Sequence, residues 1–224
     1  MLLAAGLVAT LLLPEPARAA DRLDPARRCL AIVGYAEASS EGMKGMAAVI
    51  RVMHNRVRDP RFPDHPCKVA RQKGQFQAVE ESARIKRALA APHKANLERV
   101  LLADTSFERM ILDQARRLAS DRRVARGPDP TGGALYFVNP DMMDPSRCPW
   151  FAKLKRTTRI GDHVFMRHYR KGEKRGAPAL DCRTVGKGWY AQRGESADAA
   201  RELAQASIKP IPVPRPRPTV VASR

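Results

Sequence analysis

Long apolar runs are almost absent from this 224-residue sequence. The one clear run is Met1–Leu13, which is shorter than the roughly 20 residues that a helix needs to cross a bilayer. An Ala-Arg-Ala triplet at residues 17–19 follows it and has the small-x-small pattern of a leader cleavage site, although no Lys or Arg precedes the run. We therefore predict a secretory leader over residues 1–19. The mature chain should be exported, to the periplasm or the cell exterior, and should contain no transmembrane segment.

Aromatic side chains are also scarce, at 5% of the sequence, whereas basic side chains are abundant. Lys and Arg total 41 against 23 Asp and Glu, a formal net charge of +18 at pH 7. A chain of this charge is attracted to polyanions. Because no basic motif interleaved with aromatic residues is present, we expect no nucleic-acid partner. Outside the cell, the anionic partners are the polymers of the cell envelope.

Four cysteines are present, and no two of them have the C-x-x-C spacing typical of zinc sites. In an oxidising compartment an even number of cysteines favours disulfides. Three pairings are possible. We favour Cys29–Cys67 with Cys148–Cys182, because each pair lies within one half of the chain. Each bridge should stabilise the fold by about 2–4 kcal/mol.

Two common catalytic signatures are missing. The histidines include no H-E-x-x-H pair of the zinc peptidases, and no G-x-S-x-G nucleophile elbow occurs. The sequence therefore supports neither zinc chemistry nor a serine nucleophile, and we expect no metal or other cofactor. An acidic residue remains as the catalytic candidate.

Helical periodicity dominates the first half of the sequence, and short strand-like segments follow it. We predict helices over 24–38, 43–58, 79–91 and 94–103, and a fifth that opens at a Thr105–Glu108 capping box and buries Phe107, Met110, Ile111, Ala115 and Leu118. Strands are predicted over 134–138, 157–160 and 163–167, the last two joined by Gly161-Asp162 in a type II′ turn. The fold class is α+β, mainly α, with one domain over residues 20–185. The basic, proline-rich segment 186–224 should be extended and disordered, as a cationic tether or an inert tail.

Glu37 is the most informative residue of the sequence. It lies near the end of the first predicted helix, whose other positions are largely apolar. Apolar surroundings and the negative end of the helix dipole both disfavour the ionised carboxylate and should raise the pKa of Glu37. A carboxyl that keeps its proton near neutral pH is the general acid that glycosidic cleavage needs. The alternative interpretation is a surface Glu at a frayed helix end.

Further residues are candidates for substrate binding. For Glu41 we favour capping of the next helix over a role as a second carboxylate. Gln75, Tyr136 and Asn139 can hydrogen-bond a sugar, and Phe76 can stack on one. Gly132 and Gly133 would let a chain of sugars pass close to the backbone. Ordinary turn chemistry is the alternative for each of these segments.

Taken together, these segments resemble the cell wall hydrolase family of the SleB/CwlJ type. The likeness covers roughly residues 28–168. Three positions depart from the family pattern: Ser39-Ser40 stand where Arg-Gly is usual, and Gln77 stands where a small residue is usual. The matching segments, in order, are Tyr35–Ala38, Glu41-Gly42, Asn55–Val57, Asp59–Pro63, Gly74–Phe76, Asp129–Pro140, Arg159–Gly161 and His163–Phe165.

The resemblance implies a lysozyme-like fold and a lytic transglycosylase reaction, with the single essential Glu of the family at Glu37. The implied substrate is the glycan strand of peptidoglycan, cut between N-acetylmuramic acid and N-acetylglucosamine by a wall-associated enzyme. Glu37 would protonate the leaving oxygen and then take the proton of the muramic 6-hydroxyl, which closes an anhydro ring. Attack by water instead would make the enzyme a muramidase.

Two other functions stay open. An N-acetylmuramoyl-L-alanine amidase would need a metal or a nucleophile, and the sequence shows neither. A non-catalytic cationic protein that binds the envelope would need only the charge. That reading predicts that Glu37 is dispensable and that high salt abolishes all effect. We expect a monomer.

Overall fold

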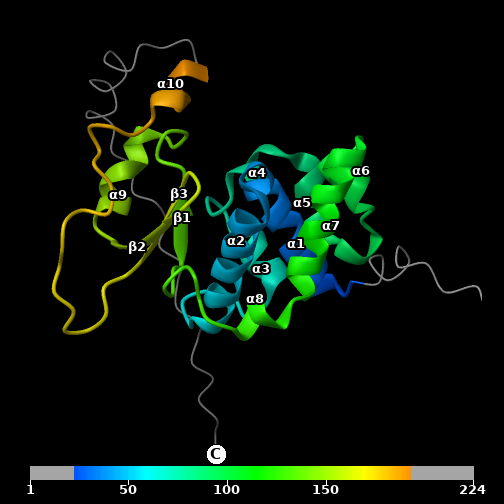
Figure 1. The fold of residues 1–224 in the computed structure, drawn as a ribbon, viewed down its shortest axis with the longest axis horizontal. Coiled ribbons are helices and arrows are strands. Elements are labelled where there is room, and N and C mark those ends of the chain that lie inside the picture. The colour runs from blue at the N-terminus through cyan, green and yellow to red at the C-terminus, as the bar shows by residue number, and fades with distance from the viewer. Residues whose placement is uncertain (1–22, 193–224) are drawn as a thin grey trace, which may run out of the picture.

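A computed structural model describes residues 23–192, which form a helical part and a smaller part that contains a sheet, side by side (Figure 1). The helical part comprises α1 Pro25–Ala38, the 3-10 turn η3 Ser39–Glu41, α2 Gly42–Arg58, α3 Pro66–Ala70, α4 Gln77–Glu81, α5 Ala83–Ala90, η4 Pro92–Lys94, α6 Leu97–Leu101, α7 Ser106–Ser120 and α8 Arg122–Arg126. The second part comprises β1 Tyr136–Val138, η5 Pro145–Arg147, α9 Cys148–Ala152, β2 Lys155–Ile160, β3 His163–Arg167 and α10 Lys187–Gln192. The predicted α+β, mainly α fold class is confirmed.

Helix α1 is the centre of the helical part. Asp24 caps its first turn by accepting a hydrogen bond from Arg27 N at 2.9 Å, and Pro25 follows at a position that needs no N–H. Residues 29–35 are all buried, because α2, α3 and α7 cover different sides of the helix. The predicted helix over 24–38 is confirmed. Its last turn brings Glu37 to the edge of this core.

Helix α2 joins the two parts because it has two apolar faces. Met46, Val49, Ile50 and Met53 pack into the core around α1. Ala48 and Val52 instead pack with Ala134 and Phe165, which belong to the second part of the molecule. The helix ends at Arg58, before the Asp59-Pro60 pair, as the sequence predicts.

The predicted helix over 79–91 is wrong, because the structure divides it into α4 and α5. Ser82 interrupts the helix with an extended backbone (ψ 105°), and its hydroxyl accepts a hydrogen bond from Ile85 N at 3.2 Å. Serine competes for backbone donors in this way and favours helix starts over helix interiors. The break turns the short α4 toward Glu37, which matters for the site.

The buried face of α7 was also predicted incorrectly in part. The capping box of Thr105 and Glu108 is confirmed. However, Phe107 and Met110 are 66% and 47% exposed, because the helix packs through a stripe further along its length. That stripe consists of Leu112, Ala115, Leu118 and Ala119.

The sheet has the order β1-β3-β2, and both pairings are antiparallel. The central strand β3 buries Val164, Phe165 and Met166. Ile160 pairs with His163 across the predicted two-residue turn. Gly161 has φ +57°, while Asp162 is not among the residues of positive φ in the described part of the chain, as a type II′ turn requires.

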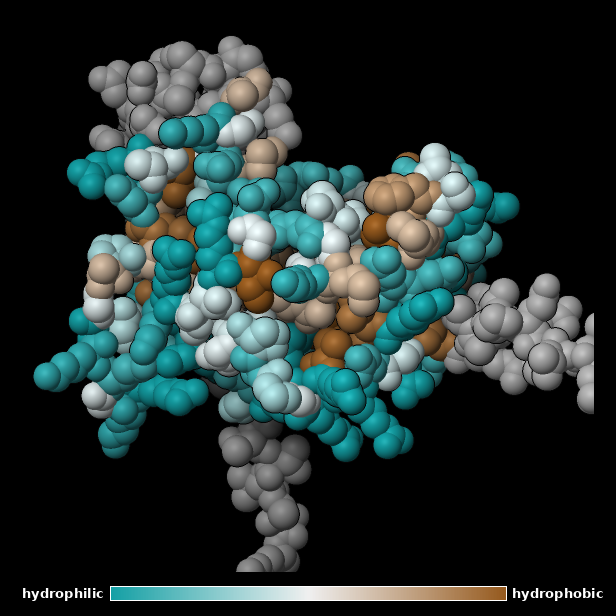
Figure 2. Space-filling model, viewed as in Figure 1, coloured by the Kyte–Doolittle hydropathy of each residue, from teal (hydrophilic) through white to brown (hydrophobic). Residues whose placement is uncertain are grey.

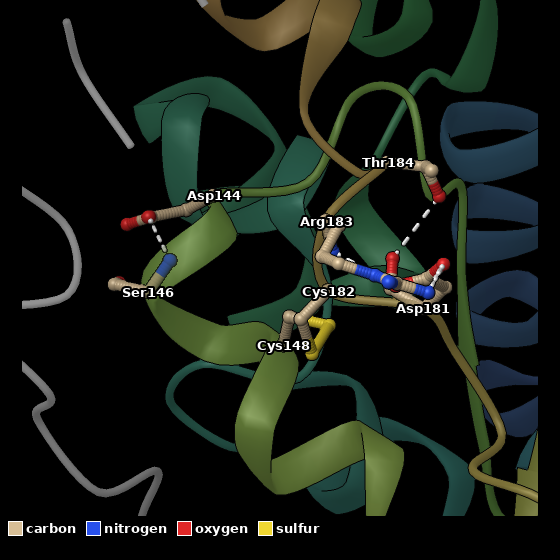
Figure 3. The surroundings of a disulfide bond; sticks show 7 residues. All are labelled: Asp144, Ser146, Cys148, Asp181, Cys182, Arg183 and Thr184. Atoms are coloured by element: carbon tan, nitrogen blue, oxygen red, sulfur yellow. Dashed lines mark hydrogen bonds and ion pairs between the residues drawn. A yellow bond between two sulfur atoms is a disulfide. The ribbon is translucent and has the colours of Figure 1, made fainter. Parts of the chain in front are cut away.

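Each part of the molecule contains one of the two favoured disulfides. Cys29–Cys67 links α1 to α3, and Cys148–Cys182 links α9 to the loop before α10. Around Cys182, Asp181 accepts hydrogen bonds from both the backbone and the guanidinium of Arg183 at 3.0 Å (Figure 3). The second bridge therefore fixes a loop that has few regular backbone hydrogen bonds of its own.

The face of the molecule in Figure 2 is mostly hydrophilic, with hydrophobic side chains showing in small patches. Within residues 23–192, no helix combines the length and the apolar character that crossing a bilayer demands. The predicted leader, residues 1–19, lies outside the described residues, as does the predicted tail from residue 193 on. Residues 187–192 of that tail form α10, and Gly186 N donates a hydrogen bond to Pro140 O at 2.8 Å.

Candidate active site

A cleft of about 400 Å³ lies between the two parts of the molecule. Its helical wall is formed by the end of α1, the η3 turn and α4. Its opposite wall is formed by β1, the loop that follows it, α9 and the β2–β3 turn. Cavities of this size bind small ligands. Glu37 lies in the helical wall.

The carboxylate of Glu37 is held by the first turn of α4. The N–H of Ala78 donates a hydrogen bond to Glu37 Oε1 at 2.9 Å. The first N–H groups of any helix have no acceptor within that helix, so they are free to bind a carboxylate. The break at Ser82 positions this turn, and its geometry could not be read from helical periodicity.

Burial raises the pKa of Glu37 to about 7, although three groups oppose the rise. The N–H groups of Ala78 and Val79 and the charge of Arg56 act to lower this pKa, whereas Glu81 raises it further. The carboxyl is therefore present in both protonated and ionised forms near neutral pH. This is the property that a group acting first as an acid and then as a base requires.

Arg56 lies beneath the cleft as a buried cation, 2% exposed. Its Nε donates to Leu135 O at 2.7 Å, and its guanidinium carbon lies 4.8 Å from the ring centre of Phe76 and 5.8 Å from that of Tyr136. Burial lowers the pKa of Arg56 to about 10, so it keeps its charge at neutral pH. Its Nη1 is buried without a hydrogen-bond partner among the described residues. Arg56 thus supplies a fixed positive charge near Glu37.

The expectation that Glu41 caps α2 is wrong. Glu41 occupies the N-cap position, but its side chain makes no capping hydrogen bond. Its Oε2 instead accepts from Asp162 N at 3.1 Å, and its Oε1 lies 2.7 Å from His163 Nδ1. Burial lowers the pKa of His163, while Glu41 opposes this change. Glu41 therefore fastens the η3 turn beside Glu37 to the β2–β3 turn across the cleft.

Four of the predicted binding residues line this cleft together with Glu37, namely Glu41, Gln75, Tyr136 and Asn139. The hydroxyl of Tyr136 lies 3.0 Å from His168 Nε2, so its ring edge is held in place. Asn139 Oδ1 accepts from Asp141 N at 3.0 Å and shapes the loop after β1.

Three of the predicted binding residues do not fit that role. Phe76 is 1% exposed and packs against Arg56 and Phe137, so its ring has no face available to a sugar. Gly132 and Gly133 are not part of the wall around Glu37. They have φ +63° and +78° and form a turn whose Gly133 N donates to Asp129 Oδ2 at 3.0 Å. They thus form a turn, which is the alternative that the sequence left open.

The departure at Ser39-Ser40 introduces no left-handed backbone. Leu102 is the one non-glycine residue with positive φ in the described part of the chain. The glycine freedom needed in this loop is supplied by Gly42, at φ +65°. Gln77 lines the cleft, and its amide donates to Glu81 at 2.7 Å.

Sequence reasoning missed several residues of the opposite wall. Trp150, Met142, Arg147 and His163 all line the cleft. Only His163 and the buried Arg56 lie in segments that carry the family resemblance, and neither had an assigned role. Within residues 23–192, no group of three or more His, Cys, Asp or Glu side chains is arranged to hold a metal ion.

A family of known proteins matches more than half of this chain, and the similar curated proteins have related names. The family described as Cell Wall Hydrolase matches residues 40–166, and Glu37 lies just before the matched region. The spore cortex-lytic enzyme of Halalkalibacterium halodurans is 29% identical over 131 residues, which is 58% of this chain and 31% of that protein. The spore cortex-lytic enzyme of Bacillus subtilis is 29% identical over 138 residues, covering 62% of this chain and 36% of that protein.

This chain spans about a third of the length of those curated relatives. Among solved structures, the catalytic domain of the germination-specific lytic transglycosylase SleB from Bacillus anthracis is similar. It is 26% identical in sequence and superimposes with a TM-score of 0.44, over 65% of this chain and 96% of that domain.

Proposed function

Because this chain belongs to the cell wall hydrolase family, we propose that it cleaves the glycan strands of peptidoglycan and that Glu37 is the catalytic acid. The observation that carries the proposal is the protonatable carboxyl of Glu37 in a cleft, with a pKa of about 7. The names of the spore cortex-lytic relatives support the same class of substrate. The proposal retains the lysozyme-like fold that the family resemblance implies.

In the proposed reaction, one carboxyl acts twice at the bond between N-acetylmuramic acid and N-acetylglucosamine. Glu37 first gives its proton to the bridging oxygen as the bond to the muramic C1 breaks, and the electron pair of that bond leaves with the oxygen. The resulting Glu37 carboxylate then takes the proton of the muramic 6-hydroxyl. As that proton leaves, the 6-oxygen bonds to C1 and closes a 1,6-anhydro ring. Glu37 is then protonated, as it was at the start of the cycle. No second carboxylate is needed.

The surroundings of Glu37 support both halves of this cycle. The N–H groups of α4 and the charge of Arg56 stabilise the carboxylate that forms after proton donation. The desolvated setting favours the protonated form that the first step needs. If water attacked C1 in place of the 6-hydroxyl, the same site would act as a muramidase.

We further propose where the enzyme works and how the chain is divided. An exported, wall-associated protein fits the two disulfides, because such bonds persist in oxidising compartments. The proposed division is a leader over 1–19, a catalytic domain over 20–185 and a basic tail over 186–224. The excess of basic side chains would hold the protein near anionic envelope polymers.

The test is digestion of purified peptidoglycan with the mature protein and with Glu37→Gln, followed by mass spectrometry of the soluble fragments. We expect anhydro-muramic ends from the wild type and none from the variant, which keeps the size of the side chain but has no acidic proton. Reducing sugar ends would mean a muramidase.

Two controls separate the alternatives. Free stem peptides, lost when a chelator is present, would support an amidase and contradict the proposal. A folded Glu37→Gln protein that acts as the wild type does, with an effect abolished by high salt, would support a non-catalytic envelope-binding protein.

A further inference from the structure

A second hollow, of about 590 Å³, lies at the other end of the sheet from the β2–β3 turn. It is formed by the C-terminal end of α2 with the loop 58–61, by Gly133 and Leu135 before β1, and by residues 167–171 at the end of β3. In Figure 1, the end of α2 lies near α8 at the bottom, whereas α4 beside the Glu37 cleft lies near the top. Nothing in the proposed reaction uses this hollow.

Five arginine and lysine side chains line the hollow, and two of them are neutralised by carboxylates. Arg61 donates two hydrogen bonds to the carboxylate of Asp59, at 2.7 and 2.8 Å. Arg167 is paired with Glu173, at 2.8 and 3.0 Å. These two ion pairs form the walls and carry no net charge.

Three other basic residues of the hollow have no such partner. Among residues 23–192, no carboxylate lies within ion-pair distance of Arg58, Arg170 or Lys171, and all three are exposed. Arg58 and Lys171 are far apart in sequence, so the fold has brought their charges together. The guanidinium of Arg58 donates to Ala125 O and to Asn55 Oδ1, whereas the side chains of Arg170 and Lys171 make no hydrogen bond or ion pair with the described residues. Their positive charges have an electrostatic cost that an anionic ligand would relieve.

The neighbourhood adds to the positive charge. Burial and the like charges of Arg51 and Arg126 lower the pKa of Arg58. Asp129 opposes this shift, but its carboxylate is already bound by Arg51 at 3.5 Å and by Asn55 Nδ2 at 2.9 Å. His168, which also lines the hollow, has its pKa lowered by burial and by Arg61. The local field is therefore suited to an anion.

The hollow and the Glu37 cleft are separated by a shared wall of side chains. His168 lines the hollow, Tyr136 lines the cleft, and the Tyr136 hydroxyl lies 3.0 Å from His168 Nε2. Tyr136 is buried, so a polymer seated against Glu37 would have to pass a side branch over this wall to reach Arg170 and Lys171. Peptidoglycan has such branches, because each muramic acid bears a stem peptide that carries carboxylates.

We propose that the hollow lined by Arg58, Arg170 and Lys171 binds a carboxylate of the peptide stem attached to the glycan in the Glu37 cleft. This inference rests on the proposed function, since it takes the glycan strand as the occupant of the cleft. Guanidinium groups suit the task because their planar donors match both oxygens of a carboxylate. The hollow would thus select stem-bearing glycan over bare glycan.

The test measures binding, in a Glu37→Gln background that prevents turnover. Calorimetric titration would compare soluble glycan fragments that carry free stems with the same fragments after the stems have been removed. The variant Arg170→Gln/Lys171→Gln removes two charges from the hollow. The matched control Lys94→Gln/Arg99→Gln removes two exposed charges from η4 and α6 of the helical part. We expect the hollow variant to bind stem-bearing fragments at least tenfold more weakly, with bare glycan and the control variant unaffected.

Equal affinity of the hollow variant and its parent for stem-bearing fragments would overturn the proposal. An equal loss in the control variant would also overturn it, because the effect would then be one of overall charge. If oligomeric glycerol phosphate bound more tightly than the stems, and only that binding depended on Arg170 and Lys171, the ligand would be a phosphate and the stem assignment would be wrong. Failure of bare glycan to bind any form of the protein would instead count against the proposed function.

Discussion

At the scale of single residues, Glu37 combines opposing influences on one carboxyl group. Desolvation raises its pKa to about 7 from a reference of 4.5, while hydrogen bonds from α4 and the charge of Arg56 limit the rise. If the surroundings were only apolar, the carboxyl of Glu37 would hold its proton too tightly to donate it readily. The pKa near 7 reflects competition between burial, which raises it, and the neighbouring positive groups, which lower it. Substitutions can test both effects.

The first prediction concerns the stability of Glu37→Gln. Because the pKa of Glu37 is raised in the folded state, the folded protein binds its proton more tightly than the unfolded chain does. The associated stabilisation is fully present below about pH 4.5 and is lost as pH rises through about 7. Glutamine does not titrate, so the free energy of unfolding of the variant lacks this pH dependence. Between pH 4 and pH 8, the stability of Glu37→Gln relative to the wild type should therefore rise by roughly 1–3 kcal/mol. Urea denaturation at both pH values measures this, and a pH-independent difference would contradict it.

The second prediction concerns Arg56 and the pH dependence of activity. The kcat/KM of the wild type should fall above about pH 7, as Glu37 loses the proton that it donates. Arg56→Gln removes a positive charge that lowers the pKa of Glu37, so this alkaline limb should move upward by up to about 1 unit. Arg56→Lys keeps the charge and should leave the limb in place. Initial rates on soluble glycan across pH 5–9 test this expectation. A limb that moved equally in both variants would mean that Arg56 acts only through packing.

At the scale of elements, the contact between η3 and the β2–β3 turn joins the two walls of the cleft. Glu41 reaches across to Asp162 N and His163, and Gly161 makes room for it. A Cβ at Gly161 would lie 1.8 Å from Glu41 Oε2, in a backbone already at φ +57°. The turn and the carboxylate are therefore fitted to each other.

The third prediction tests this fit with Gly161→Ala. We expect a loss of about 2 kcal/mol or more in the free energy of unfolding, from backbone strain together with displacement of Glu41. Gly172→Ala is the matched control, because Gly172 has φ +78° but nothing within 4 Å of an added Cβ. Part of the loss at Gly161 should vanish in the Glu41→Ala background. Denaturation of the wild type, Gly161→Ala, Glu41→Ala and the double variant measures the coupling between the two residues. If the two losses in the free energy of unfolding simply added, the turn and the Glu41 side chain would not be coupled.

At the scale of the whole molecule, the two disulfides brace the two parts separately. Cys29–Cys67 closes a sequence separation of 38 within the helical part, and Cys148–Cys182 closes one of 34 in the part that contains the sheet. The second bridge anchors α9, whose Trp150 lines the Glu37 cleft. The two bridges should therefore differ in their effect on activity more than in their effect on stability.

The fourth prediction follows from this arrangement. Replacing either pair by serine should cost roughly 3–4 kcal/mol of stability, or about 10 °C in Tm. Of the two variants, Cys148→Ser/Cys182→Ser should lose more substrate affinity below its Tm. Calorimetry and KM measurements on both variants test this, and a larger rise in KM for Cys29→Ser/Cys67→Ser would contradict it.

Local sequence patterns determined the elements that depend on neighbouring residues along the chain. The capping box at Thr105, the Gly161 turn and the end of α2 before Pro60 were all foreseen, because each depends on residues within one or two turns. Glu37 could be singled out for the same reason, as an acid at the end of an apolar helix. The sequence pattern also favoured the observed cysteine pairing.

Only the tertiary structure decided what each side chain meets across the chain. Phe76 looked like a sugar-stacking residue but supports Arg56 in the core, and Glu41 looked like a cap but reaches the β2–β3 turn. The Ala78 N–H that binds Glu37 depends on a helix break at Ser82. The contacts of Phe76 with Arg56, of Ala78 with Glu37 and of Asp162 with Glu41 join residues 20, 41 and 121 positions apart, and periodicity carries no information about partners at such distances. The pKa of Glu37 is set by those partners, so it too is decided by the fold.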